Sequence, residues 1–499
     1  MSISNAKFSA LSPFGIDRAP VLTLGGTPNL NCSRKASSFV SMSEEKADLG
    51  IASTESPESP ALKKVKREEW IDGLRGLASL QVTIFHTLSD VCWSFYRSPW
   101  ADNSQLQMSN FFRIVPVRVL AHGPGMVRLF FVISGYCIGT SLQLTTHCDS
   151  RTARPSATYY RKLSSAVVRR WLRLYLPLAV IAILCQTLWF LDLYTEEPSD
   201  LHDLCPDARP WTSPWSHLAC TITYLINALD VVNLKFTHGL HNTLWTVPLD
   251  ARGSMQSYLA LLGLANMRRK WRIVVLAALV VYHFWFCAHE IQGYVFGLLV
   301  VDIQKLVSLG GESTTAFRTW LRASAAIAFV TGLYLISLPP QQHTDPTEVL
   351  HDDYFFFKPL WLPHWENAAK YNWQAYFLGA FLVFPALLGL PECRACLCTR
   401  PLQFLGRISF SLFLVHSVVI RTLRARLIEW ALVILHAQPP DGAHPASLSW
   451  MLANGVAVIT TVVVAIVSAV LFQQKVEGPM LRWAKQIESR MTVPEEKYD

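Results

Sequence analysis

Charged residues are scarce in this sequence. Asp, Glu, Lys and Arg make up 16% of the 499 residues, hydrophobic residues make up 51%, and the mean hydropathy is +0.26. The apolar content of the chain is therefore high for a soluble protein of this length. Apolar runs of about twenty residues recur along the chain, and each is long enough to cross a hydrocarbon core about 30 Å thick. The composition therefore predicts an all-α integral membrane protein.

The basic residues do not indicate nucleic-acid binding, although the formal net charge is +8. They gather in short runs beside apolar segments, which is the distribution expected where positive charge stays on one side of a membrane. The clearest runs are "KKVKREEW" (63–70), "RKLSSAVVRRWLR" (161–173) and "NMRRKWR" (266–272). We expect a lipid bilayer as partner and no nucleic acid.

The eleven cysteines lack the pattern of a secreted disulfide framework, because most stand singly in apolar segments. Cys205 and Cys220 share an acidic loop and would bridge if that loop faces an oxidising lumen. "CRACLC" (393–398) has part of a zinc-site spacing, but no second Cys/His pair of zinc-finger spacing lies nearby. Free or lipid-modified thiols are the better interpretation. We expect no metal and no bound cofactor.

Residues 1–66 lack helical or strand periodicity and are rich in Ser, Glu, Pro and Lys, so we expect a disordered cytosolic tail. The first thirty residues contain no compact apolar region behind a basic start, so we expect an uncleaved anchor rather than a signal peptide. A transmembrane domain is predicted over 67–485 and a cytosolic tail over 486–499. The domain contains about ten predicted transmembrane helices: 71–91, 126–146, 172–193, 243–264, 272–288, 290–307, 319–338, 374–390, 404–422 and 450–472.

Charge gives the predicted orientation. Alternation of the spans puts the three basic runs on one side, the cytosol, and the acidic loops 194–240 and 344–355 on the other. The basic segment 421–427 falls on the wrong side. Both termini are then cytosolic, and the membrane is expected to be the endoplasmic reticulum or a connected endomembrane. No internal repeat with matching broken helices, as found in many transporters, is visible.

Arg75 and His86 are two ionisable residues within the first predicted span. Eleven residues place them on one helical face, about 16 Å apart along the axis. Ionisable groups at such depth usually face a protein interior or a water-filled cavity. In the alternative interpretation, Arg75 reaches the interface and His86 hydrogen-bonds a neighbouring carbonyl. Asp90, one turn after His86, would fix the imidazole tautomer or simply mark the end of the span.

The segment "WIDGLRGLASLQVTIFH" (70–86) resembles the opening signature of the membrane-bound acyltransferase-3 family, in which an Arg, ten residues and a His occupy the first transmembrane helix. The resemblance covers about 68–485, with motifs in the family's order, and its fourth motif is of the fungal type. The later motifs are "RLFFVISGYCIG" (128–139), "VVRRWLRLYLPL" (167–178), "LWTVPLDARGSMQSYL" (244–259), "QFLGRISFSLFLVHSVVI" (403–420) and "VEGPMLRW" (476–483).

The resemblance implies transfer of an acyl group, often acetyl, from acyl-CoA as co-substrate to a hydroxyl of a small metabolite, lipid or glycan. His86 is the predicted catalytic base, because a positioned His can take the proton of an attacking hydroxyl. The phosphates of coenzyme A need cationic, preferably guanidinium, partners. Arg75, Arg170 and Arg173 are predicted to supply them.

Three further residues are possible supporting groups: Asp250, Arg252 and His416. The family has Glu where this chain has Asp250, so a shared role is in doubt, and Arg252 is a possible ion-pair partner for it. His416 is more typical of a hydrogen bond between helices. Ser134 lacks a full nucleophile elbow, and with Gly135 it indicates close helix packing.

Two other functions stay open. A multi-pass transporter or acyl-group carrier would use the same intramembrane Arg and His without transferase chemistry. A degenerate, scaffold-like family member is also possible because of Asp250. No sequence feature identifies the acceptor.

Overall fold

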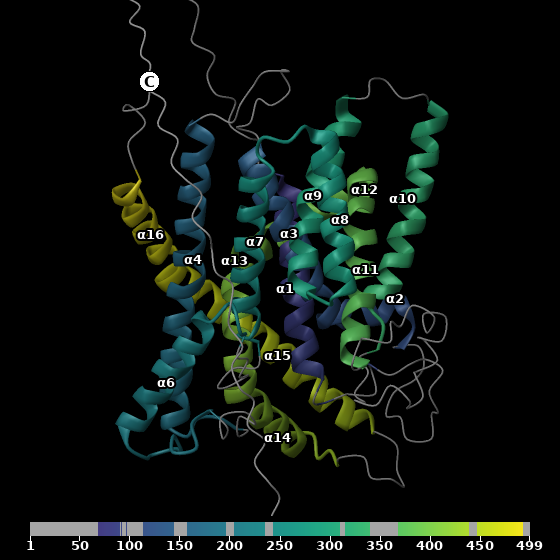
Figure 1. Ribbon diagram of the computed structural model, residues 1–499. Helices are drawn as coiled ribbons and strands as arrows, with labels where there is room; N and C mark the ends of the chain where they lie inside the picture. Colours follow the sequence, from purple (N-terminus) through teal and green to yellow (C-terminus); the bar gives the residue numbers. More distant parts are fainter. Residues whose placement is uncertain are drawn as a thin grey trace, which may run out of the picture. The chain divides into compact units, whose positions relative to one another are not determined.

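The structure is a computed structural model that describes residues 68–89, 91, 96, 113–143, 157–195, 204–234, 243–309, 315–339, 368–438 and 447–492. The chain separates into two units, Met1–Lys64 and Val65–Asp499, and every described residue belongs to the second. The regular secondary structure of the described residues is helical throughout (Figure 1), which confirms the predicted all-α class.

Every predicted span coincides with a helix, although several helices begin earlier than predicted. The elements are α1 (Glu69–Leu88), α2 (Val115–Arg118), η3 (Val119–Ala121), α3 (Gly123–Gln143), α4 (Ala157–Phe190), α6 (Pro214–Leu229), α7 (Thr246–Gly263), α8 (Arg269–Trp285), α9 (His289–Leu309), α10 (Thr315–Ile336), α11 (Ala368–Gly389), α12 (Pro391–Leu397), α13 (Arg400–Val419), η5 (Ile420–Arg424), α14 (Ala425–Ile434), α15 (Leu448–Phe472), η6 (Gln473–Glu477) and α16 (Gly478–Met491).

Fewer helices than predicted are apolar enough to cross a membrane by length and composition alone. Within the described ranges there are six such helices: Gly123–Leu142, Ala157–Phe190, Thr315–Ile336, Asn372–Gly389, Arg400–Ile434 and Leu448–Met491. The chain is thus a multi-pass membrane protein, and ten spans stay a prediction. The predicted spans outside this set lie in α1, α7, α8 and α9, helices of 17 to 21 residues that each carry two or more charged residues.

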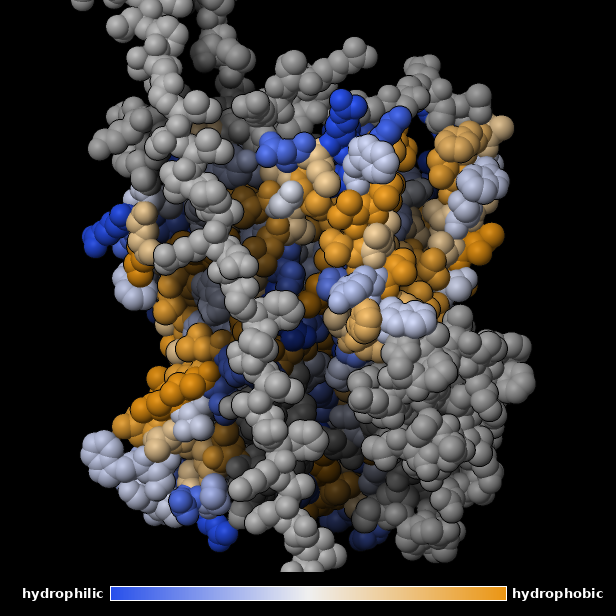
Figure 2. All heavy atoms as spheres, in the orientation of Figure 1, coloured by the Kyte–Doolittle hydropathy of each residue, from blue (hydrophilic) through white to orange (hydrophobic). Residues whose placement is uncertain are grey.

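Several charged side chains of these helices form ion pairs inside the protein. Arg272 of α8 pairs with the fully buried Asp302 of α9, and Arg252 of α7 pairs with the buried Glu290 of α9. Apolar side chains instead make up much of the coloured outer surface in Figure 2. The exposed Val330 of α10 is an example. A polar interior and an apolar exterior are the arrangement that a surrounding lipid bilayer favours.

Helices α1 and α13 pack with their backbones almost in contact. A Cβ added to Gly76 would lie 2.5 Å from the Gly406 nitrogen, and a Cβ added to Gly406 would lie 2.2 Å from the Asp72 carbonyl oxygen. Small residues permit such an approach between membrane helices. The contact brings His86 near the end of α1 beside His416 of α13.

The basic segment that violated the predicted orientation is not a loop. Arg421 and Arg424 lie in the π-helix η5 and are 7% and 2% exposed, so both are inside the protein. Charges that flank a span at the membrane surface set its orientation, whereas buried charges belong to the packing of the bundle. Arg421 and Arg424 therefore do not bear on the orientation, which stays a prediction.

Candidate active site

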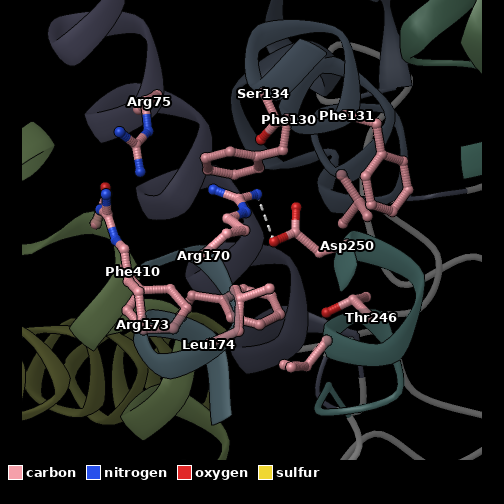
Figure 3. A pocket seen from close by; sticks show the side chains of 14 residues that line it. Arg75, Phe130, Phe131, Ser134, Arg170, Arg173, Leu174, Thr246, Asp250 and Phe410 are labelled. Carbon is pink, nitrogen blue, oxygen red and sulfur yellow. Dashed lines mark hydrogen bonds and ion pairs between the residues drawn. The ribbon is translucent and has the colours of Figure 1, made fainter. Parts of the chain in front are cut away.

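A pocket lies between helices α1, α3, α4, α7 and α13, inside the region that the family motifs cover (Figure 3). Its volume is about 700 Å³, part of it open to solvent. Much of the wall is aromatic and aliphatic, and the remainder carries three arginines, one aspartate and hydroxyl groups. The lining residues are Arg75, Val127, Phe130, Phe131, Ser134, Arg170, Arg173, Leu174, Thr246, Val247, Asp250, Ser409, Phe410 and Phe413.

The structure brings together the three arginines that the sequence predicts for the donor. Arg75 comes from α1, and Arg170 and Arg173 come from adjacent turns of α4 (Figure 3). Neither Arg75 nor Arg173 forms an ion pair with a carboxylate among the described residues. The charge of Arg75 acts on Arg173 unfavourably. An anion in the pocket would relieve this repulsion.

Arg170 is held by a hydrogen-bond network that crosses three helices. Its Nη2 atom is 2.6 Å from Asp250 Oδ2 and 2.9 Å from the Tyr294 hydroxyl, and its Nε donates to Ser254 Oγ at 2.9 Å. The Tyr294 hydroxyl also donates to Asp250. Arg170 is thus oriented and neutralised by Asp250, and the unpaired positive charge in the pocket belongs to Arg75 and Arg173.

The possible pair between Asp250 and Arg252 does not form. Residues two apart on a helix point to different sides, so Asp250 faces α4 while Arg252 faces Glu290 of α9. The shorter carboxylate that replaces the family's Glu still reaches Arg170. A role of Asp250 in orienting Arg170 is therefore compatible with the missing methylene.

His86 does not line the pocket. It lies half-buried near the end of α1, with its ring centroid 5.5 Å from that of His416, and its carbonyl oxygen accepts a bond from Arg424 at 3.3 Å. Phe413 lies between these two regions, because it lines the pocket and its ring centroid is 6.0 Å from that of His416. Asp90 lies outside the described residues.

His416 hydrogen-bonds within its own helix, so the bond between helices that its sequence context favoured stays a prediction. It is fully buried, and its Nδ1 lies 3.0 Å from the Leu412 carbonyl oxygen one turn earlier, which only a protonated Nδ1 can satisfy. Nε2 of the neutral ring is then the acceptor nitrogen. His416 therefore packs against His86 with a fixed ring orientation.

Ser134 and Gly135 lie where α3 crosses α9. A Cβ added to Gly135 would be 2.1 Å from the Tyr294 carbonyl oxygen, which confirms the predicted close packing. Ser134 in addition lines the pocket. The crossing places Tyr294 next to Arg170, so a packing feature of α3 and α9 also supports the arginine network.

Sequence reasoning missed three residues near the pocket. Tyr294 gives no signal within its apolar run, and Phe413 looks like any core aromatic. Glu477 lies in the predicted closing motif, and the structure shows it buried in η6, where it accepts a bond from Ser411 at 2.5 Å. Its charge attracts Arg173 from beyond ion-pair distance. The Glu-Gly-Pro sequence of the predicted closing motif was the one signal that the sequence offered.

The described helices define a polytopic membrane protein with a pocket that three arginines line. The chain belongs to the acyltransferase-3 family, because the family's acyltransferase domain matches residues 68–471. This confirms the resemblance seen in the sequence and makes the protein a membrane acyltransferase.

Curated relatives of the chain are fungal acyltransferases. The O-acetyltransferase PaAT-1 of Phomopsis amygdali is 25% identical over 393 residues, which are 72% of this chain and 74% of the relative. The acyltransferase R4 of Phoma sp. is 23% identical and covers 82% of this chain and 93% of the relative, and the acyltransferase clz18 of Cochliobolus lunatus is 21% identical with the same coverage. No solved structure matches the chain.

Proposed function

We propose that this protein is an O-acyltransferase that moves an acyl group, acetyl in the first instance, from acyl-CoA to a hydroxyl of a small metabolite, lipid or glycan. The observation that carries the proposal is the convergence of Arg75, Arg170 and Arg173 on one pocket, with two of these charges unmatched among the described residues. A phosphate-bearing donor suits such a site. The name of the O-acetyltransferase relative supports acetyl as the group.

In the proposed reaction, the acceptor hydroxyl approaches His86. The imidazole takes the hydroxyl proton while the oxygen attacks the thioester carbonyl carbon. When the tetrahedral intermediate collapses, the carbon–sulfur bond breaks, and the imidazolium returns its proton to the leaving thiolate. The products are the acylated acceptor and free coenzyme A, and His86 is again neutral. No bound cofactor is needed.

The distance between the arginines and His86 requires a path for the donor. The two sites are about 16 Å apart along α1, and Phe413 separates the pocket from the His86–His416 pair. We infer that a rotation of the Phe413 ring admits the thioester to His86. The slender, neutral part of the donor would then lie along the apolar wall formed by Phe410 and Phe413.

Phe413→Trp is expected to lower kcat about tenfold while donor affinity stays near that of the wild type, since an added ring in a packed site costs about 1–3 kcal/mol. Binding of radiolabelled acetyl-CoA and turnover are measured on the same purified sample. The matched control is Phe404→Trp, at an exposed position on the same helix outside the pocket. Equal turnover of the two variants would remove Phe413 from the path.

The donor proposal is tested with sealed membrane vesicles and radiolabelled acetyl-CoA. Label that moves into an extractable acylated product identifies an enzyme that uses acyl-CoA. Label that enters the vesicle lumen as intact acetyl-CoA identifies a transporter instead. Vesicles from cells that lack the protein give the background.

We further propose that the arginine end of the bundle faces the cytosol and that the membrane is the endoplasmic reticulum or a connected compartment. The bond between Cys205 and Cys220 supports an oxidising lumen at the opposite end. The exposed thiols of Cys396 and Cys398 lie at the arginine end, beside the start of α1. In the proposed orientation, the exposed thiols lie on the cytosolic side of the membrane and the disulfide on the lumenal side.

A membrane-impermeant maleimide applied to sealed microsomes is expected to label Cys396 and Cys398 and to leave Cys205 and Cys220 unlabelled. After permeabilisation and reduction, mass spectrometry should find label on Cys205 and Cys220 as well. Labelling of a Cys396→Ser, Cys398→Ser double variant gives the background from other thiols. The opposite order of labelling would invert the proposed orientation.

A further inference from the structure

A second cavity of about 710 Å³, part of it open to solvent, lies between α4, α7 and α16. Cationic side chains dominate its polar lining: Arg169, Arg170, Arg173 and Lys485, with Tyr258 beside them. Arg170 and Arg173 also line the first pocket, so the two cavities meet at these side chains.

Helix α16 forms one wall of this second cavity. It crosses α4 at an angle (Figure 1), and at this contact Ser165 Oγ donates to Glu488 at 2.5 Å and Ala484 is 3% exposed. Lys485 follows Ala484 directly and lines the cavity. Residues 478–491 lie beyond the family match, which ends at residue 471. The contribution of Lys485 is thus a feature of this chain outside the matched domain.

The second cavity carries more positive charge than the first. Asp250 neutralises Arg170, but Arg169, Arg173 and Lys485 have no ion pair with a carboxylate in the part of the chain that the structure describes. Glu488 faces Ser165 and is not among the lining residues. Several cationic side chains around one cavity favour an anion with more than one negative charge. Phosphate groups are biological anions of this kind.

We propose that the second cavity binds the nucleotide phosphates of the acyl-CoA donor, while its neutral arm passes Arg170 and Arg173 into the first pocket. This inference rests on the proposed function. A ligand with a multiply charged head and a slender uncharged arm matches a cationic cavity that joins a pocket with a largely aromatic and aliphatic wall. Helix α16 then belongs to the donor site, and Lys485 is a residue that binds the donor without taking part in the chemistry.

Equilibrium binding to purified full-length protein in phosphatidylcholine nanodiscs tests the proposal, with radiolabelled acetyl-CoA and phosphate-free acetyl-pantetheine as probes. Lys485→Gln is expected to weaken acetyl-CoA binding about 5–10-fold and to leave acetyl-pantetheine binding unchanged. Lys485→Arg should bind acetyl-CoA as the wild type does. Arg490→Gln is the matched control, because Arg490 is exposed on the same helix and does not line the cavity.

Each contrary result has a distinct meaning. If the wild type binds acetyl-CoA but Lys485→Gln and Arg490→Gln bind it equally well, the phosphate site is wrong and the proposed function stands. If the wild type does not bind acetyl-CoA at all, the donor itself is wrong. Nanodiscs that also contain phosphatidylinositol test a lipid headgroup as the occupant. If phosphatidylinositol does not displace acetyl-CoA, and Lys485→Gln loses bound phosphatidylinositol but no acetyl-CoA, the cavity serves a lipid headgroup and the inference is overturned.

Discussion

Replacing His86 by alanine is expected to lower kcat for acyl transfer by about 10²–10⁴-fold, the usual contribution of a general base. Donor affinity should change little, since His86 lies outside the arginine pocket. Purified protein is assayed with radiolabelled acetyl-CoA and, as the source of acceptor, a metabolite extract from cells that lack the protein. The rate of label transfer and the binding of donor are measured separately.

Two other histidines provide controls for this experiment. His283→Ala removes a half-buried imidazole on α8, away from the pocket, and should leave kcat unchanged. His416→Gln keeps a polar side chain beside His86 and is expected to lower kcat less than His86→Ala does, because His416 acts through the position of the His86 ring. If His86→Ala turns over like His283→Ala, His86 is not the base.

Asp250→Ala is expected to destabilise the protein by about 3–5 kcal/mol, because it leaves the Arg170 guanidinium inside the bundle without its counter-ion. The side chains of Arg170 and Asp250 are 18% and 19% exposed, so solvent screening places the loss at the lower end of that range. Asp250→Glu keeps the carboxylate and should lose less. The thermal unfolding midpoint of the solubilised protein measures the effect.

Arg322→Gln is the matched control for the Asp250 experiment. Its pair with Glu392 spans 3.8 Å, and the side chains are 62% and 70% exposed. Exposed pairs contribute little, so the unfolding midpoint should stay near that of the wild type. Equal midpoints for Asp250→Ala and Arg322→Gln would show that the Arg170 network does not stabilise the bundle.

The positions of the helices were predictable from the sequence, because apolar runs bounded by charged segments mark where helices lie. The family resemblance assigned Arg75, Arg170 and Arg173 to one donor, and the structure places all three on one pocket. Helical spacing alone also placed Arg75 and His86 about three turns apart. The helix positions and the spacing of Arg75 and His86 depend only on position along the chain, which the sequence specifies directly.

The partners of the site residues were not predictable in the same way. Asp250 was considered with Arg252, its sequence neighbour, whereas it pairs with Arg170, eighty positions away. Tyr294 completes that network from a third helix. Which neighbouring helix faces a residue depends on close packing, such as the contact at Gly76, and a single sequence does not report how two helices are rotated against each other.

The number of membrane spans, like the partners of the site residues, depends on how the helices pack as well as on their composition. Helices α1, α7, α8 and α9 are not among the six helices that qualify as membrane spans by length and composition, and each carries charged residues. The structure pairs several of these charges inside the bundle, as with Arg272 and Asp302. A polar helix surrounded by other helices need not be apolar on every side. Two charged residues of these helices, Arg75 of α1 and Asp250 of α7, also line the pocket.

The central claim is transfer of an acyl group from acyl-CoA with His86 as the base, and its most direct test is mass-spectrometric profiling of a strain that lacks the gene. Re-expression of the wild-type chain is predicted to restore a hydroxyl-bearing species heavier by one acetyl group, with the label of isotopic acetyl-CoA precursors. The His86→Ala chain, present at equal amount in the membrane, should restore none. Restoration of the acylated species by His86→Ala at the wild-type level would contradict the account.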